Sequence, residues 1–275
     1  MNLIEIAKAV LFGIVEGITE WLPISSTGHM ILLDEFVKLE VSPEFWEMFL
    51  VVIQLGAILS VVVLYWNKLI PFTFHPKIGI DKEKFSMWFK IIVASIPAGI
   101  IGLLWEDELN AMFYNYVTVA IMLILFGVLF LVVENVNRNK IAKVDSIPGI
   151  TYRAAFFIGV FQMIAAAFPG TSRSGATILA ALLIGISRTT AAEFTFFLAI
   201  PAMFGGSAIK LLKFGFDFTS SEFVILIVGM AVAFVVSILA IKFLMGYIKK
   251  HDFKAFGWYR IVLGLLVLGY FFFLG

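Results

Sequence analysis

Residues 20–29 read Glu-Trp-Leu-Pro-Ile-Ser-Ser-Thr-Gly-His and interrupt an apolar segment that extends over residues 4–33. A second polar interruption, Pro-Gly-Thr-Ser-Arg-Ser-Gly at residues 169–175, divides the apolar segment over residues 152–186. The halves on either side of each interruption are too short to span a membrane, because a hydrocarbon core of about 30 Å needs about 20 helical residues. Each segment is therefore predicted to be a re-entrant helix-turn-helix pair whose turn lies inside protein or lines a polar cavity.

The composition of the whole chain indicates an integral membrane protein. Of its 275 residues, 61% are hydrophobic and 14% are charged, whereas soluble domains have about half apolar and about a quarter charged residues. The net charge of +1 gives no indication of nucleic-acid binding, and the absence of cysteine excludes disulfides and thiolate metal sites. No removable signal peptide is expected at the N-terminus. Six further segments are long and apolar enough to be transmembrane helices, at about 46–66, 86–105, 115–134, 189–212, 222–245 and 257–274.

The two interrupted segments are similar in sequence. When they are aligned without a gap, Pro23 falls on Pro169 and Ser26 falls on Ser172. This similarity predicts a duplication in which each half has one re-entrant pair followed by three spans. Because three is odd, the second half is expected to be inverted in the membrane, and paired broken helices in an inverted repeat indicate a site near the midplane.

The predicted fold class is therefore an all-α polytopic membrane protein. A single membrane domain over residues 1–275 is made of one repeat over about 1–138 and an inverted repeat over about 139–275. Three predicted loops, 67–85, 135–153 and 246–256, are rich in lysine and arginine, whereas loop 106–114 has three acidic residues and no basic one. The positive-inside rule then places the three basic loops in the cytoplasm and both termini outside.

Glu16 and Glu20 are four residues apart, which places both carboxylates on one face of a helix. Two carboxylates in an apolar helix are costly unless they are paired, hydrated or bound to a metal. Because Pro23 and three hydroxyl residues follow directly, the pair is expected to face the interruption. The open interpretations are ligation of a divalent cation such as Mg²⁺ or Ca²⁺, acid/base chemistry, and a location at an exposed helix end.

The first turn also contains three hydroxyls, of Ser25, Ser26 and Thr27, and one imidazole, of His29. One hydroxyl is expected to cap the following helix. His29 follows Ser26 by three residues, so it either packs as a hydrogen-bonded side chain or reaches that hydroxyl. A hydroxyl in contact with a base is the minimal pair for covalent catalysis.

The second turn indicates an anion site. Backbone N–H groups at a helix N-terminus favour negative charge, and the guanidinium of Arg173 has the planar shape that suits phosphate oxygens. Thr171, Ser172 and Ser174 supply neighbouring hydroxyls. An arginine inside a membrane needs a partner, and two remain open: a ligand phosphate, or one of the two glutamates in a purely structural ion pair.

Three stretches resemble the undecaprenyl-diphosphate phosphatase family of the bacitracin-resistance type: Glu-Gly-Ile-Thr-Glu-Trp-Leu-Pro-Ile-Ser-Ser-Thr-Gly-His at 16–29, Val-Ile-Gln-Leu-Gly at 52–56 and Pro-Gly-Thr-Ser-Arg-Ser-Gly-Ala-Thr at 169–177. The resemblance covers essentially the whole chain. It implies an enzyme that uses a divalent cation to remove the terminal phosphate from undecaprenyl diphosphate, the lipid carrier of bacterial peptidoglycan synthesis. The reaction would occur on the outer side of the bacterial cytoplasmic membrane.

Position by position, the resemblance implies a catalytic set of Glu16, Glu20, Ser26, His29 and Arg173. Supporting phosphate contacts would come from Ser25, Thr27, Thr171, Ser172 and Ser174 in addition to Arg173, and the metal would lie on Glu16 and Glu20. We hypothesise that Ser26 is the nucleophile and that His29 takes its proton or later activates water. The rival hypothesis is direct attack by His29 or by a metal-activated water.

Two other classes of function remain open. Inverted repeats with broken helices are a transporter architecture, so a transporter or flippase of a phosphorylated lipid is the main alternative. The unequal chemistry of the two turns, carboxylates in one and arginine in the other, favours an enzyme. A structural subunit is the third interpretation. The expected partners are the polyprenyl diphosphate and the bilayer, and a homodimer is left open.

Overall fold

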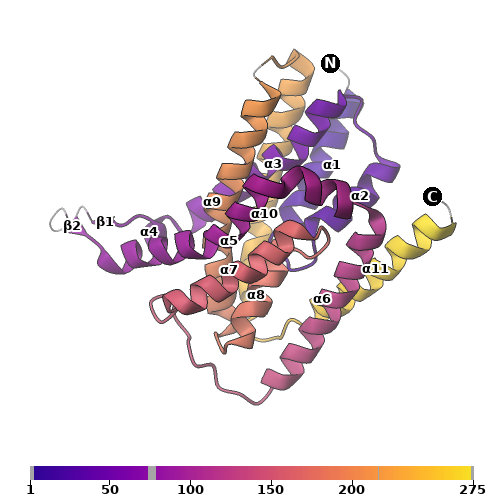
Figure 1. Cartoon of the computed structure of the whole chain (residues 1–275). Helices are drawn as coiled ribbons and strands as arrows, with labels where there is room; N and C mark the ends of the chain where they lie inside the picture. Colours follow the sequence, from indigo (N-terminus) through magenta and orange to yellow (C-terminus); the bar gives the residue numbers. More distant parts are fainter. Residues whose placement is uncertain (1–2, 74–78, 216, 274–275) are drawn as a thin grey trace.

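The structure is a computed structural model that describes residues 3–73, 79–215 and 217–273, and this part of the chain is almost entirely helical (Figure 1). His75 and Lys77 of the predicted loop 67–85 lie outside the described residues. Two short strands, β1 (Phe72–Thr73) and β2 (Gly79–Ile80), pair antiparallel in this connection. The predicted all-α class is confirmed.

Six helices of the described chain are long and apolar enough to cross a membrane, which confirms the six predicted spans. They are α3 (Pro43–Leu64), α5 (Lys82–Phe113), α6 (Tyr116–Asn137), α9 (Arg188–Phe214), α10 (Ser220–Tyr247) and α11 (Lys254–Phe273). A single turn, α4 (Trp66–Leu69), follows α3.

One predicted loop is helical in the structure. The acidic segment 106–114 was expected to be irregular, but α5 continues through it as far as Phe113. The backbone leaves helical geometry only at Trp105, with φ −136° and ψ 18°, so the helix is kinked there and then resumes. Hydropathy marks where an apolar span ends, whereas a helix continues wherever its backbone hydrogen bonds are made, and acidic residues do not prevent this.

The two interrupted segments each form a pair of short helices. The first pair is α1 (Leu3–Thr19) and α2 (Ser26–Phe36), and the second is α7 (Tyr152–Ala167) and α8 (Arg173–Leu183). Both helices of each pair have between 11 and 17 residues, and each break includes the predicted proline. The predicted interruptions are therefore present in the structure.

The two breaks share an unusual N-cap that corrects the gapless alignment. Ser25 (φ 74°) and Ser172 (φ 68°) are the two non-glycine residues with positive φ among the described residues. Each precedes the first residue of its helix and accepts a hydrogen bond from a glycine N–H three residues later. The structure therefore matches Ser25, and not Ser26, with Ser172, because the second turn has one more residue after its proline. Ser26 corresponds to Arg173.

The helices of the two halves are interleaved. Helix α1 packs on α10 of the second half, and α7 packs on α5 of the first half, while α6 and α11 lie side by side (Figure 1). Glycines make the first two contacts close, since a Cβ at Gly13 would overlap the carbonyl of Gly229, and a Cβ at Gly159 would overlap that of Ala94. This interleaving brings the break after α1 against the start of α8.

Candidate active site

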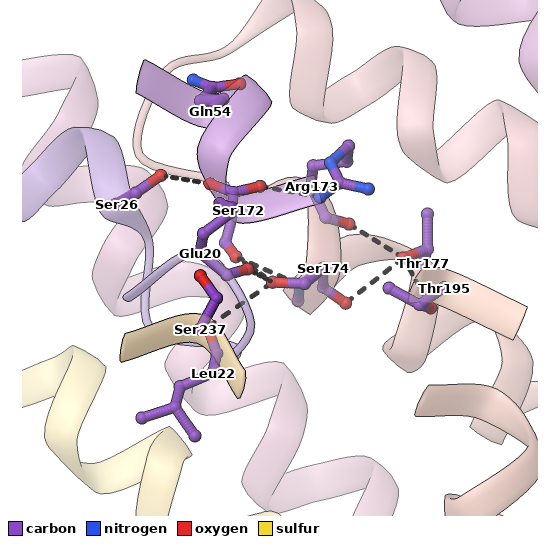
Figure 2. Close-up of polar contacts among 12 residues, drawn as sticks. Glu20, Leu22, Ser26, Gln54, Ser172, Arg173, Ser174, Thr177, Thr195 and Ser237 are labelled. Atoms are coloured by element: carbon purple, nitrogen blue, oxygen red, sulfur yellow. Dashed lines mark hydrogen bonds and ion pairs between the residues drawn. The ribbon is translucent and has the colours of Figure 1, made fainter. Parts of the chain in front are cut away.

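One carboxylate joins the two breaks. The guanidinium of Arg173 donates from Nη2 to Glu20 Oε1 at 2.7 Å, and the hydroxyl of Ser26 donates to Glu20 Oε2 at 2.8 Å (Figure 2). Ser26 is the first residue of α2 and Arg173 is the first residue of α8. The side chain of Glu20 is 8% exposed and that of Arg173 is 17% exposed, so both charges lie largely inside the protein. Glu20 therefore holds the starts of two helices together.

Hydroxyl contacts fix the start of α8 against the first break. Ser174 donates from Oγ to the backbone carbonyl of Glu20 at 3.1 Å, and its Oγ lies 3.1 Å from that of Ser172 (Figure 2). Thr177, one turn further along α8, donates to the carbonyl of Arg173 at 2.9 Å. These bonds set the position of the guanidinium relative to the Ser26 hydroxyl.

Several buried polar atoms near the breaks have no hydrogen-bond partner among the described residues: Glu16 Oε1, Gln162 Oε1, Thr171 Oγ1, Arg173 Nη1 and Trp21 Nε1. An unsatisfied buried polar group costs about 1–3 kcal/mol. The set combines a spare guanidinium N–H with a spare carboxylate oxygen. The site therefore retains both a donor for an anion and an acceptor for a cation.

His29 has partners other than Ser26. Its Nδ1 lies 2.7 Å from the carbonyl of Ser25 and its Nε2 lies 2.7 Å from the hydroxyl of Tyr259. A carbonyl only accepts, so Nδ1 carries the proton, and Nε2 of the neutral ring accepts from the tyrosine. The suggested contact between His29 and the Ser26 hydroxyl is thus absent from the structure, since the α2 backbone directs the ring back to Ser25. The base in contact with Ser26 is Glu20.

Arg260 is a residue of the site that the sequence interpretation missed. It is fully buried in α11 and donates from Nη1 to Pro23 O at 3.2 Å, and from Nη2 to Gly170 O at 3.0 Å and Thr171 O at 2.8 Å. It makes no ion pair within the described part of the chain. Arg260 therefore ties both breaks to α11. An arginine inside a predicted apolar span is the signal that would have identified it.

The remaining predicted residues occupy supporting positions. Ser25 and Ser172 act as N-caps, Thr171 is fully buried, and Thr27 is half-buried on the first turn of α2. Gln54, which lies in one of the resembling stretches, is half-buried and donates to the carbonyl of Leu50 in its own helix at 3.4 Å. The hydroxyls of Ser25, Thr27 and Ser172 therefore lie at the starts of α2 and α8, the two helices that Glu20 joins.

The donor set for a metal ion is small. Groups of three or more histidine, cysteine or acidic side chains able to hold a metal are absent from the described residues. Glu16 is buried with one unpartnered oxygen, whereas both oxygens of Glu20 are bonded to protein groups. This set fits a hard cation such as Mg²⁺, which takes one or two carboxylates and completes its shell with water and phosphate oxygens.

The chain is similar to known proteins over almost its whole length. A family model described as "Bacitracin resistance protein BacA" matches residues 9–266. A protein of Desulfitobacterium hafniense named undecaprenyl-diphosphatase is 69% identical over 271 residues, which cover 98% of each chain. Undecaprenyl-diphosphatase 1 of Clostridium acetobutylicum is 65% identical over 98% of this chain and 99% of its own. An undecaprenyl-diphosphatase of Enterococcus faecalis is 62% identical over 98% of both chains. The chain therefore belongs to the BacA family of bacitracin resistance proteins.

Proposed function

We propose that this chain is an undecaprenyl-diphosphatase, which hydrolyses undecaprenyl diphosphate to undecaprenyl phosphate and inorganic phosphate. The relatives that cover almost its whole length carry this name. The observation that carries the proposal is Glu20, which accepts a hydrogen bond from the Ser26 hydroxyl and pairs with Arg173, whose Nη1 is still unpartnered. A nucleophile, a base and an anion-binding group thus meet at one point. The product returns the lipid carrier to peptidoglycan synthesis.

Arg173 would bind the terminal phosphate. Its free Nη1 and the neighbouring start of α8 are positively polarised groups that attract phosphate oxygens. The phosphate charge would also replace part of the attraction between Arg173 and Glu20, which frees the carboxylate to act as a base. The hydroxyls of Ser172, Ser174 and Thr171 lie beside Arg173 in sequence and would supply further donors.

Ser26 is proposed to attack the terminal phosphorus. The Ser26 Oγ–P bond forms while the bond from phosphorus to the bridging oxygen breaks, and undecaprenyl phosphate leaves. Glu20 takes the serine proton and returns it to the leaving oxygen. Water then attacks the phosphoserine, its proton passes to Glu20, and inorganic phosphate leaves as Ser26 regains a hydrogen.

His29 is the alternative to Glu20 as the group that takes the water proton in the second step and returns it to the Ser26 oxygen. Its Nε2 accepts from Tyr259, which lies on α11 together with Arg260. A water that replaces the tyrosine hydroxyl at Nε2 would find a base there. Direct attack on phosphorus by His29 or by water remains the rival mechanism.

A divalent cation, Mg²⁺ or Ca²⁺, would be held by Glu16 and Glu20. The buried unpartnered oxygen of Glu16 supports this assignment. When bound, such a cation neutralises charge on the diphosphate. Glu16 would bind the cation through its unpartnered oxygen. Glu20 would also bind it when phosphate replaces Glu20 as the partner of Arg173.

Ser26→Ala tests the nucleophile. If Ser26 attacks, turnover of undecaprenyl diphosphate in detergent should fall to near the background rate. If Ser26 only donates one hydrogen bond, the loss should be about ten- to a hundredfold, at 1.4 kcal/mol per tenfold. Ser95→Ala is the matched control, because Ser95 is half-buried and bonds to its own helix at Ile91 O. A folded Ser26→Ala protein that keeps a tenth of its rate would exclude covalent attack by Ser26.

The architecture proposed around this site is an inverted repeat with two re-entrant pairs, in the bacterial cytoplasmic membrane. The interleaved packing of α1 on α10 and α7 on α5 supports it, because each contact is the counterpart of the other when the halves are exchanged. The three basic loops would face the cytoplasm, and the site would open to the extracytoplasmic side. Since the chain has no cysteine, Asp107→Cys and Lys250→Cys can be labelled singly in whole cells with an impermeant reagent. Labelling at position 250 but not at position 107 would show that the orientation is the opposite of the one proposed.

Release of phosphate in detergent also separates the enzyme from a transporter. A flippase of a phosphorylated lipid moves its substrate between leaflets and leaves the phosphoanhydride bond intact. In detergent there are no leaflets, so phosphate release can only come from hydrolysis. Purified protein that binds the lipid diphosphate without releasing phosphate would favour transport.

A further inference from the structure

A polar cavity lies at the opposite end of α8 from Ser26 and Arg173. It has a volume of about 510 Å³ and is lined by the end of α6, the segment 140–143, the connection between α8 and α9, and the end of α10. Helix α8 begins at Arg173 in the reaction centre and ends at Leu183 on the cavity wall. Its 11 residues correspond to about 16 Å of helix, so the cavity is separate from the reaction centre.

The charges that line this cavity are mostly positive. Lys140, Lys143, Lys249 and Arg188 face a single acidic residue, Glu134. The three lysines make no ion pair within the described part of the chain. The lining therefore has a formal charge of +4 − 1 = +3 from these five residues. Such a cavity attracts an anion.

Part of the cavity lining is an ion pair between Arg188 and the buried Glu134. Glu134 is 1% exposed, and it accepts from Arg188 Nε at 2.9 Å and from the backbone N–H of Phe253 at 3.0 Å. Arg188 is the first residue of α9, so the N-terminal turn of this 27-residue helix also lines the cavity. Backbone N–H groups there favour a phosphate group.

Another part of the cavity lining is apolar. Leu183 and Ile141 line it and are 49% and 93% exposed, respectively. Ile184, Ile186 and Ile248 extend this aliphatic wall. Exposed aliphatic side chains next to a basic cavity at the ends of membrane helices match a ligand with a phosphate head and hydrocarbon tails. Basic pockets between such helices are places where anionic lipid head groups bind.

We propose that this cavity binds the head group of an anionic phospholipid, with its phosphate beside Arg188 and the three lysines and its acyl chains along Leu183 and Ile141. This site is independent of the reaction at Ser26. A lipid held here would cross-link the ends of α6, α8 and α10 and the start of α9. It would therefore stabilise the half of the protein that presents Arg173.

The test is a titration of the purified protein in an uncharged detergent with short-chain phosphatidylglycerol, followed by equilibrium binding and by thermal unfolding. Phosphatidylcholine of the same chain length and inorganic phosphate are the two comparison probes. The variant Lys140→Gln/Lys143→Gln/Lys249→Gln removes the free cations. At physiological ionic strength each lysine is worth about fivefold in affinity for an anionic lipid, so the triple variant should bind about a hundredfold more weakly.

The matched control is Lys82→Gln/Arg138→Gln/Lys250→Gln. It makes the same charge change at three exposed residues, none of which lines the cavity. Arg138 and Lys250 follow α6 and α10, and Lys82 is the first residue of α5. This control should bind phosphatidylglycerol within about threefold of the unchanged protein, in agreement with the short range of screened charges. Equal loss in both triple variants, or equal binding of the two lipids, would overturn the proposal.

Inorganic phosphate distinguishes a lipid site from a site for the free anion. We expect it to raise the unfolding temperature far less than phosphatidylglycerol at the same concentration, because it makes no contact with the aliphatic wall. Equal protection by both would overturn the lipid assignment. Phosphatase activity of the cavity variant in detergent reports whether it is folded. If no preparation, including the unchanged protein, released phosphate, only the proposed function would fail, and the binding result would stand.

Discussion

Two ion pairs in this molecule join an arginine to a buried glutamate in the same local setting, but they differ in how completely their polar atoms are hydrogen-bonded. Arg173 and Arg188 are each the first residue of a helix, and each follows a serine N-cap. Arg188 binds both oxygens of Glu134, which also accepts from the N–H of Phe253. Arg173 bonds to Glu20 through Nη2 alone, while its Nη1 is buried without a partner.

The difference shows how a structural ion pair can be distinguished from one that can still bind a ligand. Removing two charges from water is costly, and the cost is offset when both groups have their full set of hydrogen bonds. The pair of Arg188 and Glu134 has no buried side-chain polar atom without a partner within the described part of the chain. The pair of Arg173 and Glu20 has one, Arg173 Nη1, and the second carboxylate oxygen of Glu20 accepts from the hydroxyl of Ser26. A purely structural role was one interpretation of Arg173, and its unsatisfied atoms favour the other.

The largest expected difference is between the two glutamates. Glu20→Gln should lower kcat by about 10²–10⁴-fold, because the base in contact with Ser26 is lost, and it should also lower the unfolding temperature, because its charged hydrogen bond to Arg173 is weakened. Glu134→Gln should leave kcat/KM within about threefold but destabilise the protein by about 1.5–3 kcal/mol, as expected for a charged hydrogen bond. Turnover and thermal unfolding in the same detergent measure both. An active Glu20→Gln protein would remove the basis of the comparison.

The two arginines should differ by a smaller factor. Arg173→Lys retains the charge but loses the planar fork, so kcat/KM should fall about 10- to 100-fold if one charged hydrogen bond to phosphate, worth about 1.5–3 kcal/mol, is lost in the transition state. Arg188→Lys should keep its activity and lower the unfolding temperature. Near-normal kcat/KM in a folded Arg173→Lys protein would show that this pair is structural as well.

Arg260 extends the comparison to an arginine whose partners are carbonyls. Arg260→Lys cannot bridge the two breaks, so we expect kcat to fall about tenfold through misalignment, with KM within about twofold. Lys90→Gln is the control, since Lys90 is a buried cation that donates to Pro148 O at 3.0 Å away from the breaks. It should lose stability without the change in kcat. Equal effects of the two variants on kcat would give Arg260 a general structural role.

Glu16→Gln should have the smallest effect on the saturated rate. If Glu16 shares a divalent cation with Glu20, the Mg²⁺ concentration for half-maximal activity should rise about tenfold, as expected for one lost charged contact, with kcat at saturating Mg²⁺ within about threefold. Titration of activity with Mg²⁺ measures this. An unchanged midpoint would exclude Glu16 as a ligand.

The sequence by itself determined the spans, the two interruptions and the kinds of side chain placed in them. Hydropathy over about 20 residues indicates whether a segment can cross the hydrocarbon core as a helix, and that property depends on the segment alone. A proline followed by hydroxyls ends one helix and caps the next, which is also local. For this reason the six predicted spans and both breaks agree with the structure, whereas segment 106–114, predicted to be a loop between two apolar spans, is helical as far as Phe113.

Only the tertiary structure decided which of these groups meet. Arg173 and Glu20 are 153 residues apart, and their contact depends on the packing of α1 on α10 and of α7 on α5. The sequence spacing suggested His29 as the partner of Ser26, but the turn around Ser25 directs the ring elsewhere and leaves the hydroxyl to Glu20. The sequence also did not show that Arg260 donates hydrogen bonds to both breaks. Sequence spacing fixes the neighbours of a side chain within one helix turn, and partners on distant helices are fixed by packing, which no short stretch encodes.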